Sequence, residues 1–124
     1  MNFLFCIAVF LHLPADEPAT ELEWCRHIKT HHLPAAGIES PLWERSRIDL
    51  LTETEAIEVD WAKKWPEGIG QAIFYSKMTG KKPVVLLLSK DLVADQRFLF
   101  RAKLAADGLV AVWIYDIKNK KLIR

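Results

Sequence analysis

Three acidic residues, Asp49, Glu58 and Asp60, stand in two segments whose alternating polar and apolar residues are typical of β-strands. In the second segment the alternation places Glu58 and Asp60 on one face and Val59 on the other. Carboxylates gathered on a strand pair repel one another unless a cation neutralises them. Hard cations such as Mg²⁺ bind carboxylate oxygens together with water and phosphate. The pattern predicts a divalent-cation site or, alternatively, the solvated polar face of an edge hairpin.

A lysine follows the carboxylates at strand spacing. If the chain stays extended beyond Asp60, Lys64 comes to the same face. Trp65 precedes Pro66, a position that disfavours helix, so extension as far as Lys64 is expected. The sequence thus predicts a cation beside the acidic pair.

The next helix combines two polar side chains with two glycines. Gln71 and Tyr75 are four residues apart and share a face, with Gly68 one turn earlier. Glycine inside a helix costs roughly 1 kcal/mol relative to alanine, so Gly68 and Gly70 indicate close approach by another group. Gln71 is therefore either a ligand-contacting residue or a buried amide that bonds to the sheet.

Hydrophobic periodicity predicts the elements that position these residues. We expect helices over residues 17–32, 66–79 and 91–106, and strands over 37–43, 45–52, 56–62, 83–89 and 109–117, with a possible short returning strand in the tail. Leu22, Cys25 and Ile28 should form the buried stripe of the first helix. The order α-β-β-β-α-β-α-β predicts a single α/β (α+β) domain, with a mixed sheet and helices on both faces.

Length and charge narrow the function classes. A chain of 124 residues with 51% hydrophobic residues forms one folded domain. The formal net charge of +1 argues against a binder that depends on bulk positive charge. The charges are nevertheless segregated: residues 49–60 hold five acids and no base, and residues 63–82 hold five lysines and one acid. The five Trp residues fit core or edge packing better than base stacking.

The N-terminal residues 1–15 are mostly apolar, and two interpretations stay open. The run has the length of a signal-peptide core but lacks a basic start, so it is either an export signal or an element packed on the domain. It is too short for a stable membrane span, which needs about 20 residues. The protein would be periplasmic in the first case and cytoplasmic in the second. His27 and His31 have a spacing that can bind metal, but surface histidines at a helix end fit better.

The succession of Asp49, Glu58-x-Asp60 and Gln71-x-x-x-Tyr75 resembles the PD-(D/E)XK nuclease superfamily, in particular its RecB and lambda-exonuclease-like branch. The segment RIDLLTETEAIEVDWAKKWPEGIGQAIFYSKMTGKKPVVLLL, residues 47–88, is also similar to small bacterial proteins of this fold, many of which begin with a signal sequence. The resemblance implies a restriction-endonuclease-like core for residues 16–124 with the order α-β-β-β-α-β.

The resemblance also implies roles for individual residues. Asp49 and Glu58 would be metal-binding and catalytic carboxylates, and the carbonyl of Val59 a further ligand. Gln71 and Tyr75 would contact substrate phosphate. Either Glu21 or Glu39 would supply an upstream acidic residue.

The chain departs from the family pattern where the motif has its lysine, because Asp60 stands there. Lys64, or otherwise Lys63, would restore a cation near the phosphate, or Asp60 would be an extra catalytic metal ligand. Similar proteins often pair a cysteine such as Cys25 with one beside the first Asp, where this chain has Leu50.

Two functions follow as expectations. The first is a nuclease dependent on Mg²⁺, or Mn²⁺, that hydrolyses phosphodiester bonds of nucleic acid, with DNA as the expected substrate and RNA left open. The second is a catalytically inactive module of the same fold that binds nucleic acid or a protein partner. Replacing Asp49 or Glu58 by alanine should abolish cleavage by the first and leave the fold intact.

Overall fold

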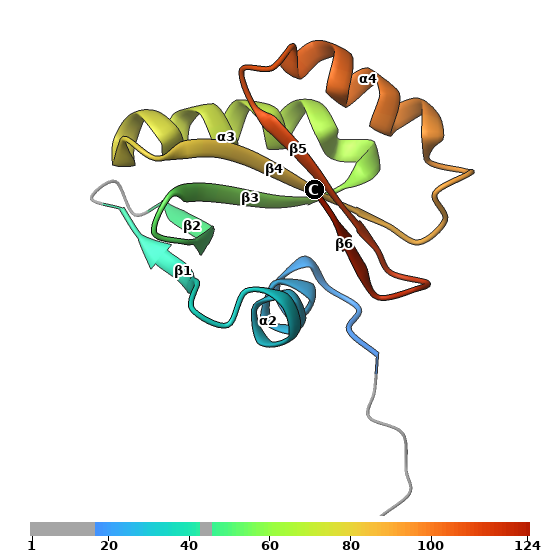
Figure 1. Ribbon diagram of the computed structural model, residues 1–124, viewed down its shortest axis with the longest axis horizontal. Helices are drawn as coiled ribbons and strands as arrows, with labels where there is room; N and C mark the ends of the chain where they lie inside the picture. Colours follow the sequence, from blue (N-terminus) through green and yellow to red (C-terminus); the bar gives the residue numbers. More distant parts are fainter. Residues whose placement is uncertain (1–16, 43–45) are drawn as a thin grey trace, which may run out of the picture.

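The computed structural model describes residues 17–42 and 46–124 (Figure 1). The helices are α2 (Glu21–His32), α3 (Trp65–Thr79) and α4 (Gln96–Ala106), and a 3₁₀ turn, η1 (Ala62–Lys64), precedes α3. The strands are β1 (Gly37–Pro41), β2 (Arg47–Leu51), β3 (Glu55–Trp61), β4 (Lys82–Ser89), β5 (Ala111–Asp116) and β6 (Lys121–Ile123). The expectations for the N-terminal segment lie outside the described residues. Within the described ranges, no helix is both long and apolar enough to span a membrane.

The six strands form one mixed sheet in the order β1-β2-β3-β4-β5-β6. β1, β2 and β3 are antiparallel neighbours, β3, β4 and β5 run parallel, and β6 returns antiparallel to β5. Helix α3 connects β3 to β4, and α4 connects β4 to β5. The structure is therefore the single α+β domain expected from the sequence, and the short returning strand is present as β6.

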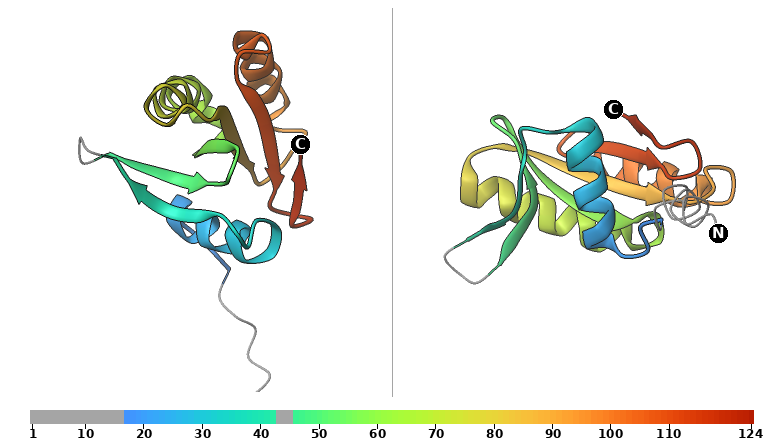
Figure 2. Two further views of the ribbon diagram at one scale, coloured as in Figure 1. Left: turned by 60° about the vertical axis from the view of Figure 1, so that its left-hand side comes forward. Right: turned by 90° about the horizontal axis from the view of Figure 1, so that it is seen from below.

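Helices cover both faces of the sheet. Figure 2 shows α2 on one side and α3 and α4 together on the other. On the α2 side, Trp24, Cys25 and Ile28 pack against apolar residues of β2 to β5. On the opposite side, α3 and α4 pack against Val85 and Leu87 of β4. β4 is buried from both sides, which explains its uninterrupted apolar run.

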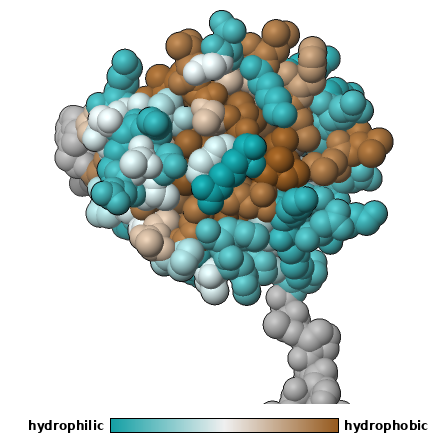
Figure 3. Space-filling view, viewed as in Figure 1, coloured by the Kyte–Doolittle hydropathy of each residue, from teal (hydrophilic) through white to brown (hydrophobic). Residues whose placement is uncertain are grey.

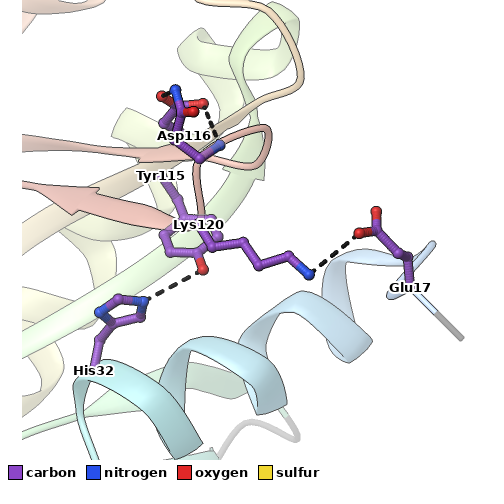
Figure 4. Close-up of polar contacts among 6 residues, drawn as sticks. Glu17, His32, Tyr115, Asp116 and Lys120 are labelled. Carbon is purple, nitrogen blue, oxygen red and sulfur yellow. Dashed lines mark hydrogen bonds and ion pairs between the residues drawn. The ribbon is translucent and has the colours of Figure 1, made fainter. Parts of the chain in front are cut away.

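Polar contacts tie α2 to the C-terminal hairpin (Figure 4). His32 Nε2 lies 3.3 Å from the Tyr115 hydroxyl of β5. Lys120, in the turn before β6, forms an ion pair with Glu17 at 3.2 Å. Asp116 accepts a hydrogen bond from the Asn119 side chain at 2.8 Å, which closes that turn. On the face shown in Figure 3, hydrophilic residues surround α2, and apolar residues gather over β5 and β6.

Two predicted helices begin later than expected. α2 starts at Glu21 rather than residue 17, because Thr20 caps it by accepting a hydrogen bond from the Glu23 amide at 3.2 Å. Leu22 was predicted to be buried but is 37% exposed, and Trp24 takes its place in the core.

α4 starts at Gln96 rather than residue 91. The Asp91 carboxylate accepts hydrogen bonds from the Val93 and Ala94 amides at 3.0 and 3.1 Å. These side-chain bonds hold residues 91–95 in turns instead of a helix. The predicted strand bounds agree with the structure to within two residues, and residues 43–45 of two predicted strands lie outside the described ranges.

Candidate active site

Asp49 lies where β2 and β3 stop pairing. The two strands pair at Leu50–Ile57 and Leu51–Ala56. Asp49 directly precedes Leu50 in β2, and its Oδ2 atom accepts a hydrogen bond from the Val59 amide at 2.8 Å. The side chain thus takes the place of a backbone partner. The N–H and C=O of one strand residue point to the same neighbouring strand. The Val59 carbonyl therefore points toward β2, as the Val59 N–H does.

Glu58 and Asp60 lie inside the sheet, facing α3. Their exposed fractions are 6% and 5%, and β3 has neighbours on both edges. Asp60 contacts the helix at Gly68. The predicted common face is therefore present, and the alternative of a solvated edge hairpin is wrong.

Burial disfavours the charged form of all three carboxylates. Burial, followed by the neighbouring Asp49 carboxylate, raises the pKa of Glu58 to about 10. Burial also raises the pKa of Asp49, although the hydrogen bond from Val59 opposes the shift. Glu58 Oε2 has no hydrogen-bond partner among the described residues. A hydrogen bond between the Asp49 and Glu58 side chains favours a proton on Glu58, and a bound cation would replace that proton.

Asp60 has a second acidic neighbour and a cation. Burial, followed by Glu21, raises the pKa of Asp60 to about 7, whereas Lys64 acts in the opposite direction. The Lys64 ammonium lies 3.6 Å from Glu21 Oε1. Lys64 reaches this place from η1, because β3 ends at Trp61, so the expected extended path to Lys64 is wrong.

Both candidates for the upstream acidic residue lie near the cluster, on different sides. Glu21 at the start of α2 acts on Asp60, and Glu39 of β1 raises the pKa of Asp49. Glu39 has a positive φ of 52° and no pairing partner in the β1–β2 register. Glu21 is the stronger candidate, because it acts directly on Asp60 and its Oε1 atom forms the ion pair with Lys64.

Gln71 and Tyr75 form one unit on α3. The Tyr75 hydroxyl donates a hydrogen bond to Gln71 Oε1 at 2.9 Å. Burial, together with Glu58 and Asp49, raises the pKa of Tyr75. Gln71 itself is exposed, so the alternative of a buried amide bonded to the sheet is wrong. The pair connects the carboxylate cluster to solvent along one face of α3.

Cys25 packs in the same core as Leu50, on the α2 side of the sheet. Burial, followed by Asp49, raises the pKa of its thiol. Cys25 is therefore a core residue beside the carboxylates and a poor nucleophile.

Gly68 and Gly70 differ in what surrounds them. A Cβ at Gly68 would lie 2.8 Å from Val85 Cγ2 and 3.4 Å from Asp60 Oδ2, whereas one at Gly70 would meet nothing within 4 Å. The expected close approach is present at Gly68, and the same expectation for Gly70 is wrong.

This difference gives a matched pair of variants. Gly68→Ala should destabilise the fold by about 1–3 kcal/mol through overpacking against β4. Gly70→Ala should stabilise it by about 0.5–1 kcal/mol through helix propensity. Urea unfolding measures both, and equal effects of the two substitutions would contradict the packing described for α3.

The donor atoms fit a hard divalent cation. Asp49, Glu58 and the Val59 carbonyl offer only oxygen, and Mg²⁺ typically takes one or two carboxylates with water or phosphate. Among residues 17–42 and 46–124, no group of three or more His, Cys, Asp or Glu side chains is arranged so that it could hold a metal ion. A cation at this place would thus depend on two carboxylates, with solvent or substrate as the other ligands.

No family model, curated protein or solved structure matches the chain. The function proposed below therefore rests on the arrangement of the residues and on the resemblance stated from the sequence.

Sequence reasoning did not predict the hydrogen bond from Val59 to Asp49. It depends on where the β2–β3 ladder ends, and the alternation of residues is the same before and after that point.

Proposed function

We propose that the protein is a nuclease dependent on Mg²⁺ or Mn²⁺ that hydrolyses phosphodiester bonds in nucleic acid, with DNA as the favoured substrate. The observation that carries the proposal is the buried Asp49–Glu58 pair, with its raised pKa values and the unpartnered Glu58 Oε2 atom. The order of elements from α2 to β4 supports it, because the PD-(D/E)XK superfamily that the sequence resembles has the same α-β-β-β-α-β core.

In this proposal the chain supplies the cation site and the groups around it. Asp49, Glu58 and the Val59 carbonyl hold the cation, which when bound supplies positive charge to the cleaved phosphate. Lys64 adds a second positive charge from the side of Asp60. Asp60, with its pKa raised to about 7, accepts the proton of the attacking water, since it titrates at the pH of the reaction. The water oxygen would form the new bond to phosphorus as the bond to the leaving oxygen breaks, and the leaving oxygen would take a proton from solvent.

The α3 face positions the substrate. Gln71 is exposed and donates its amide protons to phosphate oxygen, while its own oxygen accepts from Tyr75. The lysines of residues 63–82 offer further positive charge for the backbone of a nucleic acid.

The second candidate is an inactive module of the same fold. One observation favours it: the position of the family's lysine is Asp60, and Lys64 is already paired with Glu21. In that case the protein would bind nucleic acid through its lysines without cleaving it.

A cleavage assay separates the two candidates. Labelled single-stranded and double-stranded DNA are incubated with the protein in EDTA, in Mg²⁺ and in Mn²⁺. A nuclease cleaves only with the cation, whereas binding in EDTA with no cleavage under any condition supports the inactive module.

Lys64 and Lys103 provide a matched pair for the role of the cation. Lys64→Met should lower the cleavage rate by about 100-fold, because one charge stabilising the transition state is lost. Lys103→Met should retain most of the rate, since Lys103 is an exposed residue of α4 and has no place in the candidate site. The rate of single-turnover cleavage is the measurement, and equal loss in both variants would assign the effect to overall charge.

A further inference from the structure

An open pocket lies at the carboxyl ends of β3 and β4. Its volume is about 410 Å³, and its lining includes Trp61, Lys63, Leu88, Lys90, Asp95 and Phe98. Both strands end at the same edge of the sheet, beside the start of α4 (Figure 1). Ligands of open α/β sheets commonly bind at this edge, and pockets of roughly 300–1,000 Å³ accept small molecules.

The apolar part of the pocket offers an aromatic platform. Trp61 is partly exposed, and the Lys90 ammonium lies 5.2 Å from the centre of its ring. The Lys90 ammonium is a cation–π partner of this ring face, so a base that stacks there takes the place of Lys90. Phe98 and Leu88 form neighbouring apolar walls.

The polar side chains of the pocket carry both signs of charge. In the described part of the chain, Lys63 and Lys90 form no ion pair, and the Lys90 ammonium lies over the Trp61 ring. Two carboxylates also line the pocket: Asp95 accepts a hydrogen bond from the Ser89 hydroxyl at 2.7 Å, and Asp91 accepts hydrogen bonds from the Val93 and Ala94 amides. A ligand with a planar ring and an adjacent anionic group matches an indole face flanked by two cations.

The pocket adjoins the carboxylate cluster through four consecutive residues. Trp61 follows Asp60 directly, and Lys63 precedes Lys64, so the segment of residues 61–64 separates the two places. Because this short segment joins the two places, a ligand common to both would be a strand with adjacent nucleotides.

We propose that this pocket is a nucleotide subsite, in which one base stacks on Trp61 and its phosphate binds Lys63 and Lys90. The inference rests on the proposed nuclease function and adds a substrate class to it. A base can stack on Trp61 only when it is unpaired, so the substrate is single-stranded DNA or a frayed end.

The test uses binding without cleavage. The probe is a short labelled oligothymidylate, added in EDTA to the Glu58→Gln protein, and a matched oligomer of abasic residues has the same charge without bases. Trp61→Leu and Lys90→Met should each weaken binding of the oligothymidylate by about tenfold. Trp61→Phe, which retains an aromatic ring, and Lys103→Met, which lies outside the pocket, should bind as the parent does. The abasic oligomer should bind more weakly than the oligothymidylate to the parent and equally to Trp61→Leu.

Several results would overturn the subsite. The first is that the parent protein does not bind the oligothymidylate. The second is that Trp61→Leu binds it as tightly as the parent does. The third is that Lys103→Met loses as much affinity as Lys90→Met does. If Trp61→Leu does not fold, the comparison of Lys90→Met with Lys103→Met, together with the abasic oligomer, decides. Cation-dependent cleavage that is unaffected by Trp61→Leu and Lys90→Met, with no pocket-dependent binding, would reject the subsite and retain the nuclease. Pocket-dependent binding without any cleavage would retain the subsite and reject the nuclease.

Discussion

Glu58→Gln should stabilise the cation-free protein at neutral and alkaline pH. In the folded protein the pKa of Glu58 is raised to about 10, mainly by burial, from an ordinary value of 4.5. The unfolded chain therefore releases this proton at lower pH than the folded protein does. Glutamine has a similar shape and no proton to release, so the variant avoids the cost of burying this carboxyl group.

The sign of the pH dependence follows from proton counts. Between about pH 4.5 and about pH 10, the folded protein holds a proton on Glu58 that the unfolded chain has lost. The free energy of unfolding of the wild type should therefore fall as pH rises through this range, by at most about 1.4 kcal/mol per pH unit from this group. Glu58→Gln should remove that contribution.

Thermal and urea unfolding in EDTA across this pH range measure the effect. Glu53→Gln is the matched control, because Glu53 is exposed in the turn between β2 and β3 and should leave the pH slope unchanged. Equal slopes for the wild type and Glu58→Gln would contradict the buried, protonated state of Glu58.

Two substitutions of Asp49 should differ in their effect on stability while both abolish activity. Asp49→Ala removes the acceptor of the Val59 amide, and a buried donor left without a partner costs about 1–3 kcal/mol. Asp49→Asn keeps an oxygen acceptor of the same length and loses only the charge. We therefore expect the asparagine variant to be more stable than the alanine variant, by about 1–2 kcal/mol.

Both Asp49 variants should lose cation-dependent cleavage by at least about 100-fold, because a ligand charge is missing in each. Urea unfolding and single-turnover cleavage are measured on the same preparations. Comparable stability of the alanine and asparagine variants would contradict the hydrogen bond to Val59. Cleavage retained by either variant would remove Asp49 from the site. The hydrogen bond to Val59 adds a predicted stability cost for alanine to the initial expectation of an intact fold, which stays a prediction.

The sequence predicted the features that depend on period and burial. The alternation around Val59 placed Glu58 and Asp60 on one face, and the apolar run of β4 placed that strand in the middle of the sheet. Both patterns record which side of a strand is covered, and this is decided by the same side chains that form the core.

The exact starts of the helices could not be predicted from the sequence. Thr20 caps α2, although Pro18 and the acidic residues before it are equally good start signals. Trp65 is helical even though it precedes Pro66, so the chain turns at η1 and Lys64 reaches Asp60 by another path. In each case local preferences compete within about 1 kcal/mol, and tertiary contacts decide.

The site could be predicted as a set of residues and not as a geometry. The type and spacing of Asp49, Glu58, Gln71 and Tyr75 identified the members. Three features depend on how β2, β3 and α2 meet. They are the unpartnered Glu58 oxygen, the choice between Glu21 and Glu39, and the pocket beside Trp61. Those contacts are long-range in the sequence and leave no local signal.

The most direct test is calorimetric titration of Mg²⁺, and separately Mn²⁺, into the wild type and into Glu58→Gln, with DNA cleavage followed in the same solutions. We predict saturable binding to the wild type, cleavage that rises with site occupancy, and loss of both in the folded Glu58→Gln variant. Cleavage without the cation, or equal cation binding and cleavage by the two proteins, would contradict a metal-dependent nuclease built on Asp49 and Glu58.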